Sequence, residues 1–276
     1  MRLFIALARG VLPLIALGCG GDMFTSGPPA DAGDGGSGGR TDSGGDTSSA
    51  ETSDTFCAAN PNHLLCADFD EGAFPSPFGY TTSASSTLST PKVAGDTTDY
   101  FSAPESAEAQ IPLLIKGEWA QSLLSAAVTS KDAAGSQLRL ALELEIGADC
   151  MSTDGTTVAR VVVGAYGLSI KVLAGPATQL VESSYAPDGG VSSLIAAHTV
   201  DAAPSAWVQL VLGVDLALKT ATLTIGATVS SIALEGASAE TAASASIFVG
   251  AEASAVTAGA LACRVHADDV VFDINP

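Results

Sequence analysis

The chain has little positive charge and few aromatic side chains. Removing Arg2 and Arg9 of the N-terminal leader leaves nine Lys and Arg against 30 Asp and Glu, a net charge of −21. Nucleic acids and anionic membrane surfaces attract basic patches, so this balance argues against both as partners. Only 5% of the residues are Phe, Trp or Tyr, which weighs against tight glycan binding because sugars stack on aromatic rings.

Several catalytic and metal-binding motifs are also missing. Residues 56–276 contain no Gly-x-Ser-x-Gly elbow and no His-Glu-x-x-His pair, so nucleophilic and zinc-dependent hydrolysis find no support. No strand leads into the glycine-rich tract before the domain, which does not fit a phosphate-binding loop. The chain has no Cys-x-x-Cys pair, and His63, His198 and His266 are far apart, which argues against a cysteine-based zinc site.

The chain begins with a segment typical of an export signal. Arg2 and Arg9 give it a basic start, and Val11–Leu17 forms an apolar core too short to span a bilayer. Cys19 follows, and the whole resembles a bacterial lipoprotein signal, in which the cysteine after the cleavage site receives lipid. We therefore predict a signal peptide at 1–18, lipidation of Cys19 and a place in the cell envelope, anchored to the outer membrane.

Two other interpretations of the leader stay open. Lipoprotein signals usually carry Leu three residues before the cysteine and a small residue two before, whereas this chain has Ala16 and Leu17. An ordinary secretion signal followed by a coincidental cysteine would fit these residues, and so would an uncleaved anchor.

A change in composition divides the remainder into a tether and one domain. Residues 19–55 are dominated by Gly, Asp, Ser, Thr and Pro and offer little to bury, so we expect a flexible tether there. Residues 56–276 are rich in Val, Leu, Ile, Ala, Ser and Thr, and their number is enough for one sizeable core. We expect a single domain held clear of the membrane.

Four cysteines remain after Cys19, which is the even number expected of a disulfide-bonded exported domain. They are Cys57, Cys66, Cys150 and Cys263. Three pairings exist, and the sequence does not choose among them rigorously. We favour Cys57–Cys66 as a short local loop and Cys150–Cys263 as a link between the middle and the end of the chain.

The hydrophobic pattern of the domain has a period of two. In 137–147, Leu and Ile at even positions alternate with Arg, Ala and Glu, which is typical of a half-buried strand. The same alternation occupies 206–216. Further predicted strands are 158–163, 167–173, 221–225, 231–234, 245–249 and 270–274. Many short strands separated by Gly, Pro and Asp turns predict an all-β, antiparallel two-sheet sandwich or barrel.

Five segments, in order, resemble the concanavalin A-like, laminin-G-type jelly rolls of bacterial surface proteins. They are LCADFD at 65–70, SAPES at 102–106, WVQLVLGVD at 207–215, IFVG at 247–250 and DDVVFD at 268–273. The resemblance spans nearly all of 64–276. It implies two curved antiparallel sheets, a jelly roll, with the first and last strands adjacent. It implies no particular activity, because this scaffold carries lectins, adhesive modules, glycosidases and structural domains.

The sharpest enzymatic hypothesis is glycoside hydrolysis. Jelly-roll glycosidases place carboxylates at alternate positions of one strand, where one protonates the leaving group and another attacks. Glu143 and Glu145 have this spacing and Asp149 follows, but Gly147 and Ala148 stand where a third acid is expected. No Trp or Tyr flanks these carboxylates. The simpler interpretation is that Glu143 and Glu145 form the solvated face of a strand, and we expect no catalytic residues.

A structural calcium ion is the only cofactor that the sequence suggests. Asp68 and Asp70 open the domain, whereas Asp268 and Asp269 close it. If the terminal strands are adjacent, these carboxylates converge, and calcium prefers such oxygen ligands. The alternative is that the four acids cap exposed strand ends.

Three functions follow from the sequence. The first is a non-catalytic binding or adhesion module with polysaccharide as the candidate partner, the second is a structural envelope lipoprotein without a small-molecule ligand, and the third is a carbohydrate-active enzyme. The rings available to stack on sugars, outside obvious core positions, are Tyr80, Tyr100, Phe101, Tyr166 and Tyr185. Trp207 begins a strong strand, so we expect it in the core.

Overall fold

The computed structural model describes residues 56–70, 73–85, 90–130, 134–150, 154–186, 191–204, 206–237, 241–255 and 261–275. The expected signal peptide at 1–18, the lipidated Cys19 and the tether at 19–55 lie outside these residues. Within the described ranges, no helix has the length and apolar character that a membrane span needs. A four-residue helix, α1 (Phe56–Ala59), precedes the first strand.

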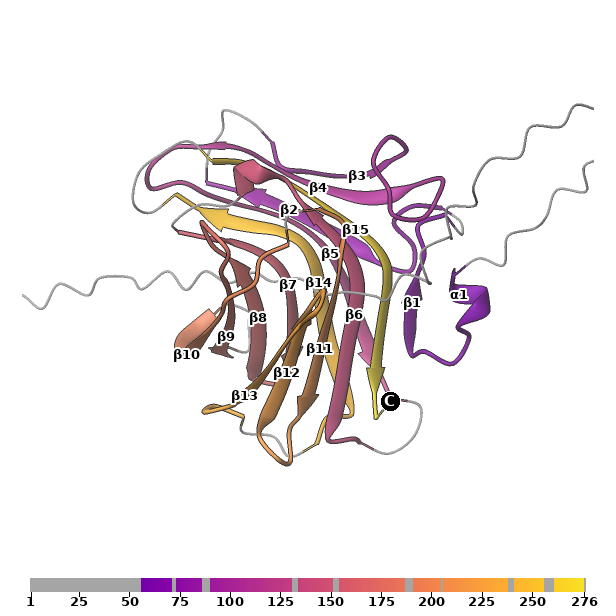
Figure 1. Cartoon of the computed structure of the whole chain (residues 1–276), viewed down its shortest axis with the longest axis vertical. Helices are drawn as coiled ribbons and strands as arrows, with labels where there is room; N and C mark the ends of the chain where they lie inside the picture. The colour runs from indigo at the N-terminus through magenta and orange to yellow at the C-terminus, as the bar shows by residue number, and fades with distance from the viewer. Residues whose placement is uncertain are drawn as a thin grey trace, which may run out of the picture.

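Two antiparallel sheets form a sandwich, which confirms the predicted fold class (Figure 1). Sheet A contains β1 (Leu65–Ala67), β3 (Lys92–Asp96), β4 (Ser106–Leu114), β6 (Gln137–Ile146), β11 (Val208–Asp215), β12 (Thr220–Ile225), β13 (Thr228–Ala233) and β15 (Leu261–Ile274). Their order across the sheet is β13-β12-β11-β6-β15-β4-β3, and β1 pairs with β15.

Sheet B packs against sheet A. Its strands are β2 (Gly79–Ala84), β5 (Trp119–Thr129), β7 (Thr156–Val163), β8 (Tyr166–Val172), β9 (Thr178–Tyr185), β10 (Val191–Val200) and β14 (Ser244–Ser254). Their order is β10-β9-β8-β7-β14-β5-β2. The long strands of both sheets bend strongly (Figure 1).

The alternating pattern of the central strands places one side of each in the core between the sheets. In β6, the side chains from Leu138 to Ile146 at even positions are at most 3% exposed. All eight predicted segments fall on strands, namely β6, β7, β8, β11, β12, β13, β14 and β15. Among these eight, the boundary of β15 differs most, because the strand begins at Leu261 and not at Val270. The strands that were not predicted are β1, β2, β3, β4, β5, β9 and β10.

The first and last strands are adjacent, as the jelly-roll resemblance implies. Leu65 of β1 lies opposite Phe272 of β15. β4 accompanies β15 as far as Ala267, and β1 takes the same side from Val270. A bulge against β6 lies between these partners, and Asp269 there has a φ of 48°. Asp268 and Asp269 therefore lie where β15 changes from one neighbouring strand to the other.

Both favoured disulfides are present in the structure. Cys57–Cys66 joins α1 to β1, and Cys150–Cys263 joins the 3-10 turn η1 (Ala148–Cys150) to β15. These bonds use all four cysteines of the domain, which excludes a zinc site built on cysteine thiolates. Two disulfides are typical of a domain that folds in an oxidising compartment outside the cytoplasm.

Candidate functional site

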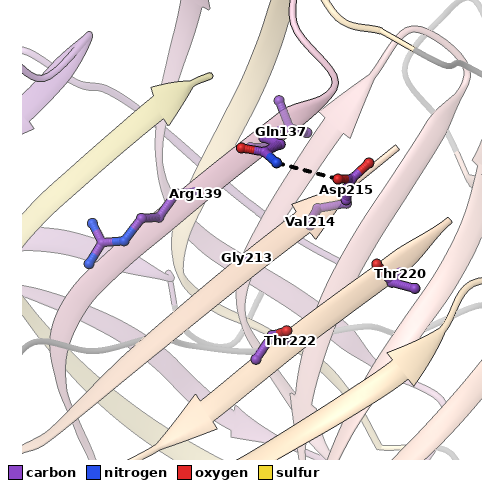
Figure 2. Close-up of a pocket in the computed structure, with 8 residues that line it drawn as sticks. Gln137, Arg139, Gly213, Val214, Asp215, Thr220 and Thr222 are labelled. Carbon is purple, nitrogen blue, oxygen red and sulfur yellow. Dashed lines mark hydrogen bonds between the residues drawn. The ribbon is translucent and has the colours of Figure 1, made fainter. Parts of the chain in front are cut away.

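The outward face of sheet A carries most of the polar side chains that could form a site. At one end, Gln137, Arg139, Gly213, Asp215 and Thr222 line an open pocket of about 220 Å³ (Figure 2). The carboxylate of Asp215 is already engaged, because it accepts hydrogen bonds from the Gln137 side chain at 3.4 Å and from the Leu218 backbone. Without an aromatic wall or a free charge at Asp215, this pocket gives little basis for choosing a ligand.

A buried acidic cluster lies at the bulge of β15. One carboxylate oxygen from each of Asp68, Asp268 and Asp269 lies within 4.8 Å of the others, and all three residues are less than 9% exposed. Asp68 follows β1, so the adjacency of the first and last strands brings it to the other two. Glu143 of β6 lies opposite Asp268 in the sheet register and is 1% exposed.

Some oxygens of this cluster have partners and others do not. Asp68 accepts hydrogen bonds from the backbone N–H groups of Phe56 and Asp70, at 2.9 and 3.1 Å. Asp268 accepts two from Ser102, both at 3.0 Å. Among the described residues, Glu143 Oε1 and Asp269 Oδ1 are buried without a hydrogen-bond donor.

Burial and mutual repulsion make these carboxylates reluctant to ionise. Burial, followed by the charges of Asp269 and Asp268, raises the pKa of Glu143 to about 9. Burial and the neighbouring Asp268 raise the pKa of Asp269 to about 8. The pKa of Asp268 rises to about 7, mainly through burial. A bound divalent cation would reverse this balance, because its charge stabilises the ionised carboxylates.

The donor set of the cluster fits calcium. Calcium takes six to eight oxygen ligands. It would coordinate the buried carboxylate oxygens that receive no hydrogen bond from the described residues. The alternative that these acids cap exposed strand ends is wrong for Asp68, Asp268 and Asp269, which are buried. Asp70 lies at the margin, where its Oδ1 accepts a hydrogen bond from the backbone N–H of Glu105.

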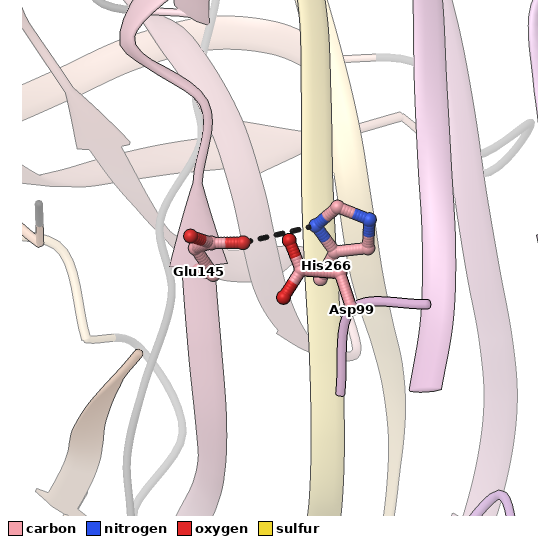
Figure 3. Close-up of side chains that lie close together, drawn as sticks. All are labelled: Asp99, Glu145 and His266. Atoms are coloured by element: carbon pink, nitrogen blue, oxygen red, sulfur yellow. Dashed lines mark ion pairs between the residues drawn. The ribbon is translucent and has the colours of Figure 1, made fainter. Parts of the chain in front are cut away.

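A second cluster lies beside the first on the same face. Ligand atoms of Asp99, Glu145 and His266 lie within 4.8 Å of one another (Figure 3). His266 is central, because its Nδ1 lies 3.3 Å from Glu145 Oε2 and its Nε2 lies 3.2 Å from Asp96 Oδ2. Burial, together with a hydrogen bond to Asp99, raises the pKa of Glu145. Hydrogen bonds from Thr98 lower the pKa of Asp96.

Aromatic rings border this second cluster. Trp207 donates a hydrogen bond from Nε1 to Asp99 Oδ1 at 3.0 Å. Its ring centre lies 6.0 Å from that of Phe101 and 6.2 Å from that of His266. The expectation that Trp207 belongs to the core is therefore wrong: it is half-buried on the outward face, because it continues the outward side of β11.

A third polar site lies on the outward face of sheet B. Arg160 of β7 forms an ion pair with Glu252 of β14. Its guanidinium lies 5.7 Å from the ring centre of Tyr185 and 5.5 Å from that of Phe248. Arg160, Tyr185 and Phe248 line a pocket of about 240 Å³. Its other lining residues are Val162, Gly164, Ala186 and Ser246.

Solved structures similar to this chain include two that are similar over most of their own length. The cellulose-induced protein Cip1 has a TM-score of 0.50 at 13% identity, covering 75% of this chain and 96% of its own. An endo-β-1,4-glucuronan lyase from the fungus Trichoderma reesei has a TM-score of 0.53 at 12% identity, covering 77% and 96%. The domain therefore has the jelly-roll sandwich fold of these structures, which is consistent with the concanavalin A-like resemblance of the sequence. At these identities the likeness shows the fold alone, and the sequence matches no family model and no curated protein.

The three carboxylates of the glycosidase hypothesis lie in different surroundings. Glu143 belongs to the buried acidic cluster and Glu145 to the His266 cluster, although both project from the same side of β6. Asp149 is exposed in η1 and lines a separate surface pocket with Arg264. The interpretation of Glu143 and Glu145 as a solvated face is wrong for Glu143, because its side chain is buried beside Asp268 and Asp269.

Two of the five rings expected to be available for sugars are buried in the jelly roll. Tyr166 is 3% exposed and donates a hydrogen bond to Glu182 at 2.8 Å. Tyr185 is 7% exposed, although it lines the Arg160 pocket. The other three rings, Tyr80, Tyr100 and Phe101, are exposed.

Sequence reasoning missed most of the second and third sites. Asp96, Asp99 and His266 were not singled out together, because they come from segments far apart in the chain. Arg160 and Phe248 were missed for the same reason. One signal was present: His266 and Asp268 alternate on one strand as Glu143 and Glu145 do on another, so polar outward faces on two strands of one sheet could have been paired.

Proposed function

We propose that this jelly roll is a non-catalytic glycan-binding module, displayed outside the cytoplasm from a lipid anchor at Cys19. The observation that carries the proposal is the pocket of Arg160, Tyr185 and Phe248 on sheet B. Its volume of about 240 Å³ suits one sugar ring of a chain better than a large ligand, since drug-sized ligands occupy pockets of about 300–1,000 Å³.

The chemistry of this pocket favours a neutral sugar. A hydroxyl group both donates and accepts hydrogen bonds, and the pocket offers it the Arg160 guanidinium as a donor and the Ser246 hydroxyl as a donor or acceptor. The ring of Phe248 is half-buried, so part of its surface is open to stacking. Because Glu252 already neutralises Arg160 and the chain is strongly acidic, a negatively charged polysaccharide is a poorer match.

The similar structures support a glycan as the class of partner. One is named as a lyase of glucuronan and the other as a protein induced by cellulose. These names indicate a class of ligand. The place of binding on this chain is the Arg160 pocket.

Glycan binding is testable by an array of neutral polysaccharides followed by calorimetry. We expect Phe248→Ala to weaken the affinity for a selected glycan about tenfold, or about 1.4 kcal/mol, because it removes a central ring. Tyr80→Ala is the matched control, since Tyr80 is 59% exposed and does not line the pocket. If the folded wild-type protein binds no glycan on the array, the proposal fails and the structural envelope role replaces it.

The lipid anchor is tested separately. We expect Cys19→Ser to abolish incorporation of labelled palmitate and to move the protein from the membrane fraction to the soluble fraction, because several acyl chains on one cysteine provide the anchor. Arg9→Lys, which retains the basic leader, should leave both properties unchanged. Undiminished palmitate labelling of the Cys19→Ser protein would show that Cys19 is not the lipidated residue.

We also propose that the buried acidic cluster binds one calcium ion as a structural cofactor. Asp68, Asp268 and Asp269 would supply ligands, with Glu143 beside them. The ion would neutralise charges that the fold has buried together, and so would fix β1, β15 and the segment at Ser102 against one another. The ion would take no part in glycan binding, because the Arg160 pocket lies on the other sheet.

A further inference from the structure

The cluster of Asp99, Glu145 and His266 has a different chemistry from the buried acidic cluster beside it. The register pairs His266 with Glu145 and Asp268 with Glu143, so the two clusters occupy successive outward positions of β15 and β6. Successive positions on one face of a strand are about 7 Å apart. The second cluster adds an imidazole nitrogen to two carboxylates, and nitrogen is a ligand that calcium does not prefer.

The surroundings of His266 determine which nitrogen faces the carboxylates. Thr98 donates hydrogen bonds to Asp96 Oδ1 from its backbone N–H at 2.8 Å and from its hydroxyl at 2.7 Å. These bonds hold the Asp96 carboxylate so that Oδ2 lies 3.2 Å from His266 Nε2. Nε2 therefore carries the hydrogen, and a neutral His266 has its lone pair on Nδ1.

That lone pair is aimed into the cluster. The side chain of His266 is 7% exposed, and its Nδ1 is buried without a hydrogen bond of acceptable geometry among the described residues. Glu145 Oε2 lies 3.3 Å from this nitrogen (Figure 3). A lone pair facing a carboxylate is repulsive, so this arrangement requires either a proton or a cation between the two groups.

Asp99 is oriented in a similar way. Trp207 Nε1 donates a hydrogen bond to Asp99 Oδ1 and leaves the second oxygen of that carboxylate for the cluster. In metal sites, such outer partners set the tautomer and direction of the ligands and are nearly as important as the ligands themselves. Two of the three candidate ligands here have such a partner, Asp96 behind His266 and Trp207 behind Asp99.

We propose that Asp99, Glu145 and His266 bind one zinc ion. Ligand atoms around a tetrahedral zinc, each at about 2.1 Å, are separated by about 3.4 Å, so atoms already within 4.8 Å need only small side-chain movements. One nitrogen and two carboxylate oxygens suit zinc, and the fourth position is open to water or another ligand. Asp99 and Glu145 are half-buried, so the ion can enter from solvent.

The test is a zinc titration of the purified full-length protein in excess calcium, which occupies the acidic cluster. Competition with a chromophoric zinc indicator should give one site per chain. We expect His266→Gln to weaken zinc binding at least 100-fold and Asp96→Asn, which removes only the outer partner, to weaken it about 10- to 100-fold. His63→Gln is the matched control, because His63 also pairs with an aspartate, Asp273, at 2.6 Å.

The alternative is a proton in place of the metal, and it gives a different result. If wild-type protein binds no zinc and the imidazole of His266 is doubly protonated at pH 8 by NMR, the cluster is an ion pair and the proposal is overturned. Zinc binding that survives His266→Gln would also overturn it. Should that variant fail to fold, Asp99→Asn provides the same test from a loop outside the sheet, and a thermal melt verifies its fold.

Discussion

Replacing both Cys150 and Cys263 with serine is expected to lower the free energy of unfolding by about 4.8 kcal/mol. The bond closes a loop between residues 113 positions apart, and in the chain-entropy model a disulfide stabilises more when the loop is longer. For a domain of this size, the loss corresponds to a melting temperature lower by about 10–20 °C. Chemical denaturation of the oxidised wild type and the double variant measures the difference.

The second disulfide is the internal control for this prediction. Cys57 and Cys66 are nine positions apart, so serine at both sites is expected to cost about 2.6 kcal/mol by the same relation. The long link joins η1 to β15, whereas the short one joins α1 to β1. Equal losses from the two double variants would contradict the loop-length argument and would point to local packing as the source of stability.

The fold was largely predictable because its core strands carry a local signal. β6 and β11 carry Leu, Ile or Val at every second position along their whole length, and eight predicted segments fall on strands. β10 was missed because most of its side chains are exposed or half-exposed, so an edge strand of this kind carries no apolar alternation. β4 was missed because Ala and Pro weaken its pattern between Ser106 and Leu114.

The sites depended on information that a local pattern does not contain. Convergence of Asp68, Asp268 and Asp269 was predictable, since it requires only that the first and last strands are adjacent. Burial of Glu143 was not, because it depends on the bulge of β15 that places Asp268 and Asp269 beside it. The cluster at His266 draws on four separate segments, and no spacing along the chain indicates that Asp99 and Trp207 meet there.

Calcium is expected to raise the melting temperature of the wild-type protein by about 5–10 °C at neutral pH. At a hundredfold excess over the dissociation constant, a ligand of the folded state adds about 2.7 kcal/mol of stability, and about 2–4 °C accompany each kcal/mol in a domain of this size. Melting the protein in chelator and in millimolar calcium measures the shift. No difference between the two would rule out calcium at this cluster.

The pH dependence without calcium follows from the raised pKa values of Glu143, Asp268 and Asp269. These three reach about 9, 7 and 8, whereas ordinary carboxyl groups titrate near 4. The folded protein therefore holds protons that the unfolded chain releases. The stabilisation that these three carboxyl groups contribute is fully present below about pH 4 and is lost as the pH rises toward 9. Calcium replaces these protons, so its stabilising effect should grow between pH 5 and pH 8.

The Asp269→Asn variant distinguishes the effect of calcium binding on stability from the effect of carboxyl protonation. Asparagine tolerates the positive φ of 48° at this position, so the bulge of β15 should survive the change. The variant keeps the oxygen but loses the charge. We therefore expect it to lose most of the calcium response and to be more stable than the wild type in chelator at pH 8, because one repulsive carboxylate is gone.

Asp201→Asn, at an exposed residue, is the matched control and should change neither property. A variant that lost stability equally with and without calcium would indicate that Asp269 serves the fold alone. The opposite signs expected in chelator and in calcium distinguish a metal ligand from an ordinary buried aspartate.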